Sequence, residues 1–435
     1  MGQWARGFRL RQQIKGSLWF VPLIGGLIGV ALAEVTGWLE PLVSVPAGWS
    51  YSASTAQGIL IAIVGAMVSL LGFVVAIGTL VVQLATGTLS PRFMRLWFRD
   101  RLQKFVLATF VGSIALAFSL LRQVNAGRVP SIGVTVAGVA VGVSLVMLLL
   151  YFNRFAHFLR PVGVGELVAQ RGLREAQRVT EMARRHHAEP ATGPVVTDEP
   201  AATVAARRSG IIQAINTGAL ITVAQQYDCV LLLNASVGDF VPVGSAVIDI
   251  HATGRVPDPR LLAGLVALGN ERSIEDDPGF ALRILVDIAI RALSPAVNDP
   301  TTAVQIIDHV ELLLFGMSAM IETTGRVVLH DEHHQARVVM PVRDFANYLQ
   351  LAVTEIRQYG ARSAQVCRRL TVLLQALHAA VEPARRPLVA AELAKLERSI
   401  AASFTDPDDL AFARQSDRQG IGGPGRTGPS GGLAT

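Results

Sequence analysis

The polar residues best suited to binding a ligand gather in one stretch of the second half of the chain, Ala292 to Ala303, with Asp287 just before it. Carboxylate, amide and hydroxyl oxygens are the ligands that Mg²⁺ and Ca²⁺ prefer, and the N–H groups at the start of a helix can hold an anion. The same stretch can also be a structural corner, because an aspartate followed by proline is typical of a capped helix start. A small-ion or anion site and a capped corner therefore both stay open for Asp287, Asn298, Asp299, Thr301 and Thr302.

The sequence contains few of the residue patterns that are typical of enzymes. There is no nucleophile beside a general base, no phosphate-binding glycine loop and no dinucleotide fingerprint. The cluster His330 to His334 and the pair His186 and His187 lack further ligands at metal-site spacing, so we expect solvated side chains there. The sequence predicts no enzyme, no catalytic residue, no cofactor and no metal site.

A second candidate is a stripe of small and polar residues in the apolar segment from Gly58 to Ser90. Steps of four and three residues place it on one face of a helix. In lipid there is no hydrophobic drive between helices, so such a face marks close helix packing or the lining of a polar path. The fourth apolar segment has a similar face around Ala137, which makes it the expected partner of this helix. The stripe contains Gly65, Ser69, Gly72, Ala76, Thr79 and Gln83.

These residues sit in a chain whose composition indicates a membrane protein. Half of the 435 residues are hydrophobic (51%), and the long charge-free runs all lie before residue 153. They predict four transmembrane helices at about 17–35, 58–86, 105–121 and 131–152. We expect the first run to be retained as a span, although Ala31-Leu32-Ala33 resembles a signal-peptide cleavage site.

The basic residues orient these spans. Arg92 to Lys104 form a basic loop after the second span, whereas Leu39 to Gln57 contains no Lys or Arg. The positive-inside rule then places both termini in the cytoplasm of a bacterial plasma (inner) membrane. The net charge of +6 is interpreted as membrane orientation and contact with anionic lipid, with no nucleic acid as partner.

The remainder of the chain predicts a cytoplasmic α+β part that follows a membrane domain at 1–160. An amphipathic helix and a linker occupy 161–208, a small β module 209–255 and a mainly helical domain 256–415, before a disordered tail at 416–435. In the helical domain Asp277-Pro278 and Asp299-Pro300 predict two capped helix starts. The fold class is thus an α-helical integral membrane protein with a cytoplasmic α+β part.

Five stretches of the chain carry a resemblance when taken together: Gln83 to Asp100, Gly238 to Val241, Glu271 to Pro278, Ala292 to Ala303 and Glu355 to Gly360. They resemble a family of bacterial predicted membrane proteins, domain of unknown function 2254. The resemblance implies an amino-terminal membrane part and a cytoplasmic part, and it implies no activity.

Two functions follow as hypotheses. The first is a homo-oligomeric, channel-like conduit in the lipid bilayer, with the stripe as its lining and the cytoplasmic part as a regulatory domain. The alternative is a membrane-anchored ligand-binding or regulatory protein without transport, in which neighbouring helices cover the stripe and Asn298 and Asp299 mark the working surface.

Overall fold

The computed structural model of the chain describes residues 4–42, 50–88, 99–125, 129–158, 160–193, 195–196, 198–320 and 325–421. It divides into two compact units, each described here by itself. The four-helix unit is Gln12–Arg160, and the mixed unit combines Met1–Arg11 with Pro161–Thr435. The first eleven residues were expected with the spans. They group with the mixed unit because the Ala5 N–H donates to the Gly264 carbonyl oxygen at 3.1 Å.

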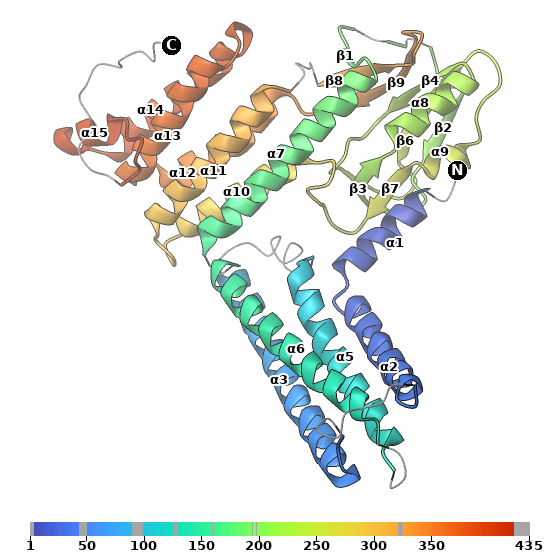
Figure 1. Cartoon of the computed structure of the whole chain (residues 1–435). Helices are drawn as coiled ribbons and strands as arrows, with labels where there is room; N and C mark the ends of the chain where they lie inside the picture. Colours follow the sequence, from blue (N-terminus) through green and yellow to red (C-terminus); the bar gives the residue numbers. More distant parts are fainter. Residues whose placement is uncertain are drawn as a thin grey trace, which may run out of the picture. The chain divides into compact units, whose positions relative to one another are not determined.

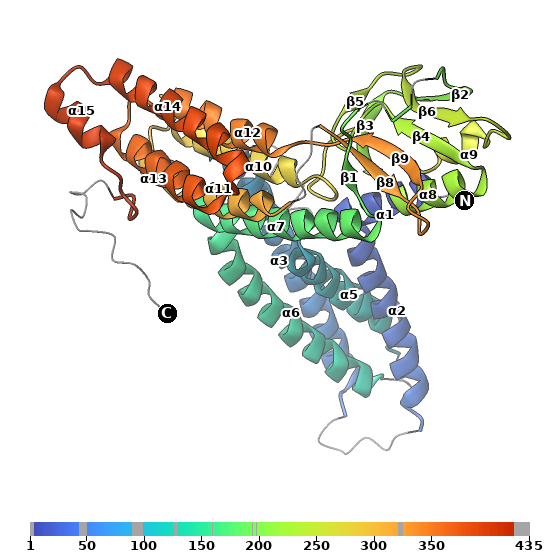
Figure 2. The ribbon, with the colours of Figure 1, turned by 90° about the horizontal axis from the view of Figure 1, so that it is seen from above.

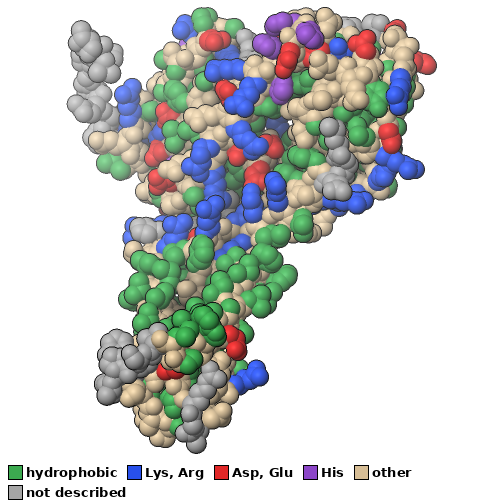
Figure 3. Space-filling model, turned by 45° about the vertical axis from the view of Figure 1, so that its right-hand side comes forward, with side chains coloured by type: hydrophobic (Ala, Val, Ile, Leu, Met, Phe, Trp, Pro, Cys, Tyr) green, Lys and Arg blue, Asp and Glu red, His purple; other side chains and the backbone are tan. Residues whose placement is uncertain are grey.

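The four-helix unit contains four helices that are long and apolar enough to cross a membrane. They are α2 (Phe20–Leu39), α3 (Ala53–Thr88), α5 (Arg101–Gln123) and α6 (Ser131–Phe158). Figure 3 shows hydrophobic side chains spread over the outer surface of these helices. Leu27, Phe73 and Leu149 are each more than half exposed. A water-soluble surface rarely leaves this much apolar area uncovered, so the unit has the surface that a lipid environment requires.

Helix α5 is central to this unit, and α2 approaches it most closely. A Cβ atom added to Gly25 would lie 2.4 Å from the carbonyl oxygen of Ala108, and one added to Gly29 would lie 2.2 Å from that of Gly112. Two small residues four apart on each helix thus let the backbones touch. No larger residue fits at Gly25 or Gly29 while the two helices keep this distance.

Helix α6 also packs against α5. The Ser144 and Ser113 hydroxyls lie 3.1 Å apart and are buried, and a Cβ atom on Gly133 would lie 2.4 Å from Leu120 Cδ2. The small-residue face of α6 also reaches α3, as expected, because Ala137 lies in one apolar cluster with Leu60 of α3 and Leu116 of α5. The surface of α3 that it contacts is the apolar face, and the small-residue stripe of α3 stays exposed.

The helices of the mixed unit form a bundle in which one face of α7 packs closely against α10 and α11. A Cβ atom on Gly172 would lie 2.6 Å from the Ala281 Cβ, and one on Gly165 would lie 2.7 Å from the Ile306 Cδ1. The bundle consists of α7 (Pro161–Arg185), α10 (Pro278–Ala292), α11 (Pro300–Ser318), α12 (Phe345–Gly360), α13 (Ala364–Ala380), the 3₁₀ turn η3 (Pro383–Arg385), α14 (Arg386–Ser403) and α15 (Pro407–Arg414).

The strands of the mixed unit form two sheets. The larger has the order β1-β8-β9-β4-β6-β2 and the smaller the order β5-β3-β7. Neighbours are antiparallel except β4 and β9, which pair in parallel through Leu231 with Val338 and Leu232 with Val339. The strands are β1 (Glu189–Pro190), β2 (Ala202–Ala205), β3 (Gly210–Ile215), β4 (Cys229–Leu233), β5 (Phe240–Val241), β6 (Ala246–Ala252), β7 (Val266–Gly269), β8 (Arg326–His330) and β9 (Ala336–Pro341).

The sheets reach beyond the β module expected at 209–255. The segment expected to be a linker contains β1 and β2, and the segment expected to be helical contains β7, β8 and β9. Strands of two to six residues carry too few alternations to be recognised, and their partners lie far away in the chain. Figures 1 and 2 show the strands gathered with α8 (Thr217–Gln226) and α9 (Pro259–Ala263), while α1 (Trp4–Gly16) begins beside β3 and β7.

Candidate functional site

The small-residue stripe of α3 is exposed along its whole length within the four-helix unit. Because successive residues are about 100° apart on a helix, the buried residues Leu60, Met67, Val74 and Val81 lie on the opposite side. A Cβ atom added to Gly65 or Gly72 would meet no atom within 4 Å. Neighbouring helices of the same chain therefore do not close the stripe in the described part of this unit. The exposed positions are Gly65, Ser69, Gly72, Ala76, Thr79 and Gln83.

The hydroxyl groups of the stripe bond to the helix itself. The Ser69 hydroxyl donates to the Gly65 carbonyl oxygen at 2.9 Å, and the Thr79 hydroxyl donates to the Val75 carbonyl oxygen at 3.0 Å. These bonds remove the cost of leaving a hydroxyl donor unsatisfied in lipid. The stripe is thus a smooth, shallow surface that another helix can approach.

The second candidate, Ala292 to Ala303, has the geometry of a capped corner. Asp299 caps α11, since one carboxylate oxygen accepts from the Thr302 N–H at 3.0 Å and the other from the Thr302 hydroxyl. Asn298 is exposed and has a φ of +48°, a left-handed conformation that asparagine tolerates. Thr301 is exposed beside it.

Asp287 has a different role from its neighbours in this candidate. Its carboxylate accepts from Arg283 Nε at 2.7 Å. Arg283 also donates to both carboxylate oxygens of Glu355 on α12, at 2.5 and 2.8 Å. Asp287 therefore holds Arg283, which links α10 to α12, whereas Asp299 caps the start of α11.

A buried carboxylate that the sequence predicts only as a cap holds three segments together. Asp277 is 4% exposed and caps α10 through the Phe280 N–H at 3.2 Å. It also accepts from Arg272 at 2.6 and 3.1 Å. Gly238 passes so close, with a φ of +94°, that a Cβ atom there would lie 2.7 Å from the Asp277 carboxylate. No spacing rule reveals this ion pair, because the hairpin turn, Arg272 and α10 meet only in the folded chain.

An open groove of about 500 Å³ lies beside this junction, with Asp239, Arg343 and Glu355 as its charged lining residues. Asp239 accepts from the N–H and hydroxyl of Ser236 at 2.8 and 3.1 Å, and Glu355 is held by Arg283. Both carboxylates of the groove are therefore engaged in contacts within the fold.

The His-rich turn between β8 and β9 is organised by Asp331. Its carboxylate accepts from the N–H groups of His333 and Gln335 at 2.9 and 3.0 Å and from Arg337 Nε at 2.7 Å. His187 and His334 pack their rings 4.5 Å apart. Within the described ranges, no group of three or more His, Cys, Asp or Glu is placed to hold a metal ion.

We expect Asp331→Asn to lower the stability of the protein at neutral pH and to flatten its acid unfolding curve. The hydrogen bond from Arg337, followed by those from the backbone, lowers the pKa of Asp331 to about 2, against about 3.9 in an unfolded chain. The stabilisation is thus present above about pH 4 and lost as the pH falls toward 2. Urea unfolding midpoints from pH 7 to pH 2 measure it. Asp228→Asn is the control, because Asp228 binds the same arginine from an exposed position, and a constant deficit of Asp331→Asn across this range would contradict the prediction.

Comparison with known proteins identifies the family. The model of the family described as Predicted membrane protein (DUF2254) matches residues 15–376. The chain belongs to this family. The DUF2254 match runs from the end of α1 through the four apolar helices and the sheets into α13. Both units are therefore part of what defines a DUF2254 protein.

The relatives of this DUF2254 chain include two mycobacterial proteins. It is 28% identical over 429 residues to Uncharacterized protein Mb1321c of Mycobacterium bovis and to Uncharacterized protein Rv1290c of Mycobacterium tuberculosis. The match covers 92% of this chain and 79% of each relative. No solved structure matches the chain. It is thus a predicted membrane protein whose relatives carry no assigned activity.

Proposed function

We propose that this DUF2254 protein is a homo-oligomeric conduit in the bacterial plasma membrane, in which α3 helices of several copies meet along their stripes. The mixed unit then lies on the cytoplasmic side as a regulatory domain. The single observation that carries the proposal is the exposure of the α3 stripe on a helix of bilayer length.

The spacing of the stripe supports packing against another helix. Alternating steps of three and four residues average 3.5, the repeat of helices that pack lengthwise in a left-handed supercoil. Gly58, Gly65 and Gly72 recur every seventh residue, and each glycine costs about 1 kcal/mol of helix propensity relative to alanine. Packing of a second α3 helix against these glycines would offset that cost, because small residues allow close backbone contact.

A closed ring of copies would turn this seam into a path. Homo-oligomers close by rotation about an axis, and the stripe would place Ser69, Thr79 and Gln83 near that axis. The alternative, a membrane-anchored regulatory protein, is favoured by the hydroxyl bonds within α3, which allow the stripe to face lipid at little cost.

The number of copies in native-lipid discs tests the proposal. We expect several copies for the wild-type chain and at least a tenfold weaker association for Gly72→Leu, because the added side chain separates the backbones. Gly142→Leu on α6 is the matched control: Gly142 is also exposed, and a Cβ atom there meets nothing within 4 Å.

Ion flux into liposomes separates a conduit from a packed oligomer. A monomer in the discs, or an oligomer that passes neither K⁺ nor Cl⁻, would exclude the conduit. An oligomer equally weakened by Gly142→Leu and Gly72→Leu would place the contact elsewhere.

A further inference from the structure

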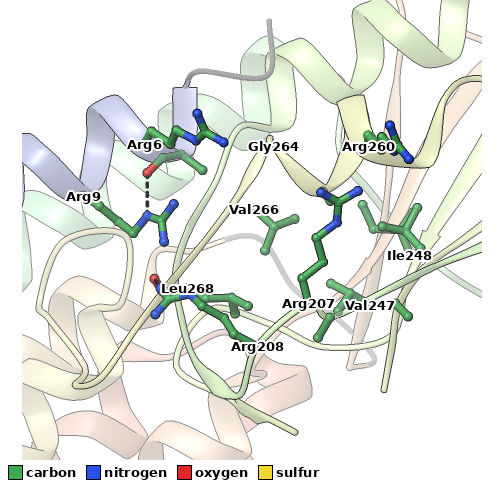
Figure 4. Close-up of a pocket in the computed structure, with 15 residues that line it drawn as sticks. Arg6, Arg9, Arg207, Arg208, Val247, Ile248, Arg260, Gly264, Val266 and Leu268 are labelled. Atoms are coloured by element: carbon green, nitrogen blue, oxygen red, sulfur yellow. Dashed lines mark hydrogen bonds between the residues drawn. The ribbon is translucent and has the colours of Figure 1, made fainter. Parts of the chain in front are cut away.

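Five arginines of the mixed unit line one pocket of about 340 Å³. Arg6 and Arg9 come from α1, Arg207 and Arg208 from the segment between β2 and β3, and Arg260 from α9. Figure 4 shows them arriving at the pocket from these separate elements, with Val247, Ile248 and Val266 among them. No acidic side chain is among the residues that line it.

These arginines lack the counter-ions that three well-buried arginines of the same unit have. Arg283 binds Asp287 and Glu355, Arg337 binds Asp228 and Asp331, and Arg369 binds Asp308 and Glu311. None of the five pocket arginines forms an ion pair with a residue that the structure describes. Five positive charges therefore converge on the pocket without a carboxylate among the residues that line it.

The hydrogen bonds of the pocket arginines hold two of them in place without neutralising them. Arg9 Nε donates to the Ala5 carbonyl oxygen at 3.2 Å, and Arg208 donates to that of Leu268. Both are half-buried, and the pKa of Arg208 is lowered by burial and by the charge of Arg9. The nearest carboxylate in sequence, Asp258, caps α9 through the Arg260 N–H at 2.8 Å and does not line the pocket.

We infer that this pocket binds a ligand with two or more phosphate groups. Guanidinium groups match phosphate oxygens with paired N–H donors, and several converging arginines without acids favour more than one phosphate. The volume is that of a small-molecule site. The valine, isoleucine and leucine side chains of the lining suit an apolar or planar portion of the same ligand, such as a nucleobase or the glycerol and acyl chain of a lipid.

Helix α1 closes the pocket on one side, so a bound ligand would hold this helix in place. Ala5 is buried against Ala214 and Ala267, with Trp4 and Phe8 beside it, while Arg6 and Arg9 of the same helix line the pocket. A bound phosphate group would cross-link α1 to the sheets. This inference is independent of the conduit, since it involves no residue of α3.

The test uses the full chain in discs of phosphatidylcholine, with ATP and inorganic pyrophosphate as soluble probes and calorimetry as readout. The variant Arg207→Gln with Arg260→Gln removes two exposed pocket charges and should bind at least about tenfold more weakly, since each charged hydrogen bond contributes about a factor of ten. The control Arg362→Gln with Arg386→Gln changes the net charge equally at exposed positions that do not line the pocket. Equal thermal unfolding in these discs shows that all variants are folded.

A second arm separates a soluble ligand from a lipid headgroup. Discs that contain cardiolipin, which has two phosphate groups, should raise the unfolding temperature of the wild type and the control but not of the pocket variant if the source is a lipid. Binding of a probe in the first arm, lost in the pocket variant, indicates a soluble source. The inference is overturned if neither probe nor cardiolipin has an effect, or if the pocket and control variants respond alike.

Discussion

Replacing Gly29 by leucine is expected to prevent the four-helix unit from folding. The added Cβ atom alone would lie 2.2 Å from the Gly112 carbonyl oxygen, 3.0 Å from its carbonyl carbon and 3.1 Å from the Leu116 nitrogen. All three are backbone atoms, which cannot move aside as a side chain does. Because α2 and α5 would have to separate, we expect a loss above about 3 kcal/mol, beyond the usual range for overpacking.

Leucine substitutions at two further glycines provide the comparison, because these positions are less crowded. A Cβ atom on Gly26 would lie 3.2 Å from a methyl group of Val111, which can rotate, and one on Gly138 of α6 meets nothing within 4 Å. Size-exclusion profiles and thermal melting in detergent should rank Gly29→Leu as most damaging, Gly26→Leu as intermediate and Gly138→Leu as close to wild type. A well-folded Gly29→Leu protein would show that α2 does not pack on α5 in this way.

Replacing Asp277 by serine is expected to destabilise the mixed unit by about 2–4 kcal/mol. Serine can still cap α10, so the loss comes from the buried ion pair with Arg272. Arg272 would retain its charge against the hairpin turn at Gly238 without a carboxylate beside it. Urea unfolding, followed by far-UV circular dichroism, measures the change in the free energy of unfolding.

Asp299→Ser is the matched control, because Asp299 caps α11 in the same Asp-Pro setting. We expect less than about 0.5 kcal/mol there, since one capping residue replaces another. The double variant Asp277→Ser with Arg272→Met should recover part of the loss if the ion pair is responsible. If both variants lost the same free energy of unfolding, Asp277 would act only as a helix cap.

The sequence predicts the features that one segment determines alone. Four long apolar runs are enough to locate α2, α3, α5 and α6, and Asp-Pro pairs are enough to locate the starts of α10 and α11. These predictions depend only on helix periodicity and capping.

Features that are assembled from distant segments could not be predicted from the sequence. The strands β8 and β9 complete a sheet that β4 begins, and the buried contact between Ser113 of α5 and Ser144 of α6 depends on how the two helices fit together. The arginine pocket combines Arg9, Arg208 and Arg260, whose separations in the chain follow no motif. Whether the stretch at Asn298 binds a ligand stays a prediction, since its observed contacts are those of a helix start.

The parallel pairing of β4 with β9 has a consequence for the order in which the protein acquires its structure on the ribosome. Leu231 pairs with Val338, and α10 and α11 are synthesised between them. Until β9 emerges, one edge of β4 has no partner, and such an edge invites pairing with other chains. Nascent chains that stall before Pro341 should therefore be prone to aggregate, although their membrane helices are already complete.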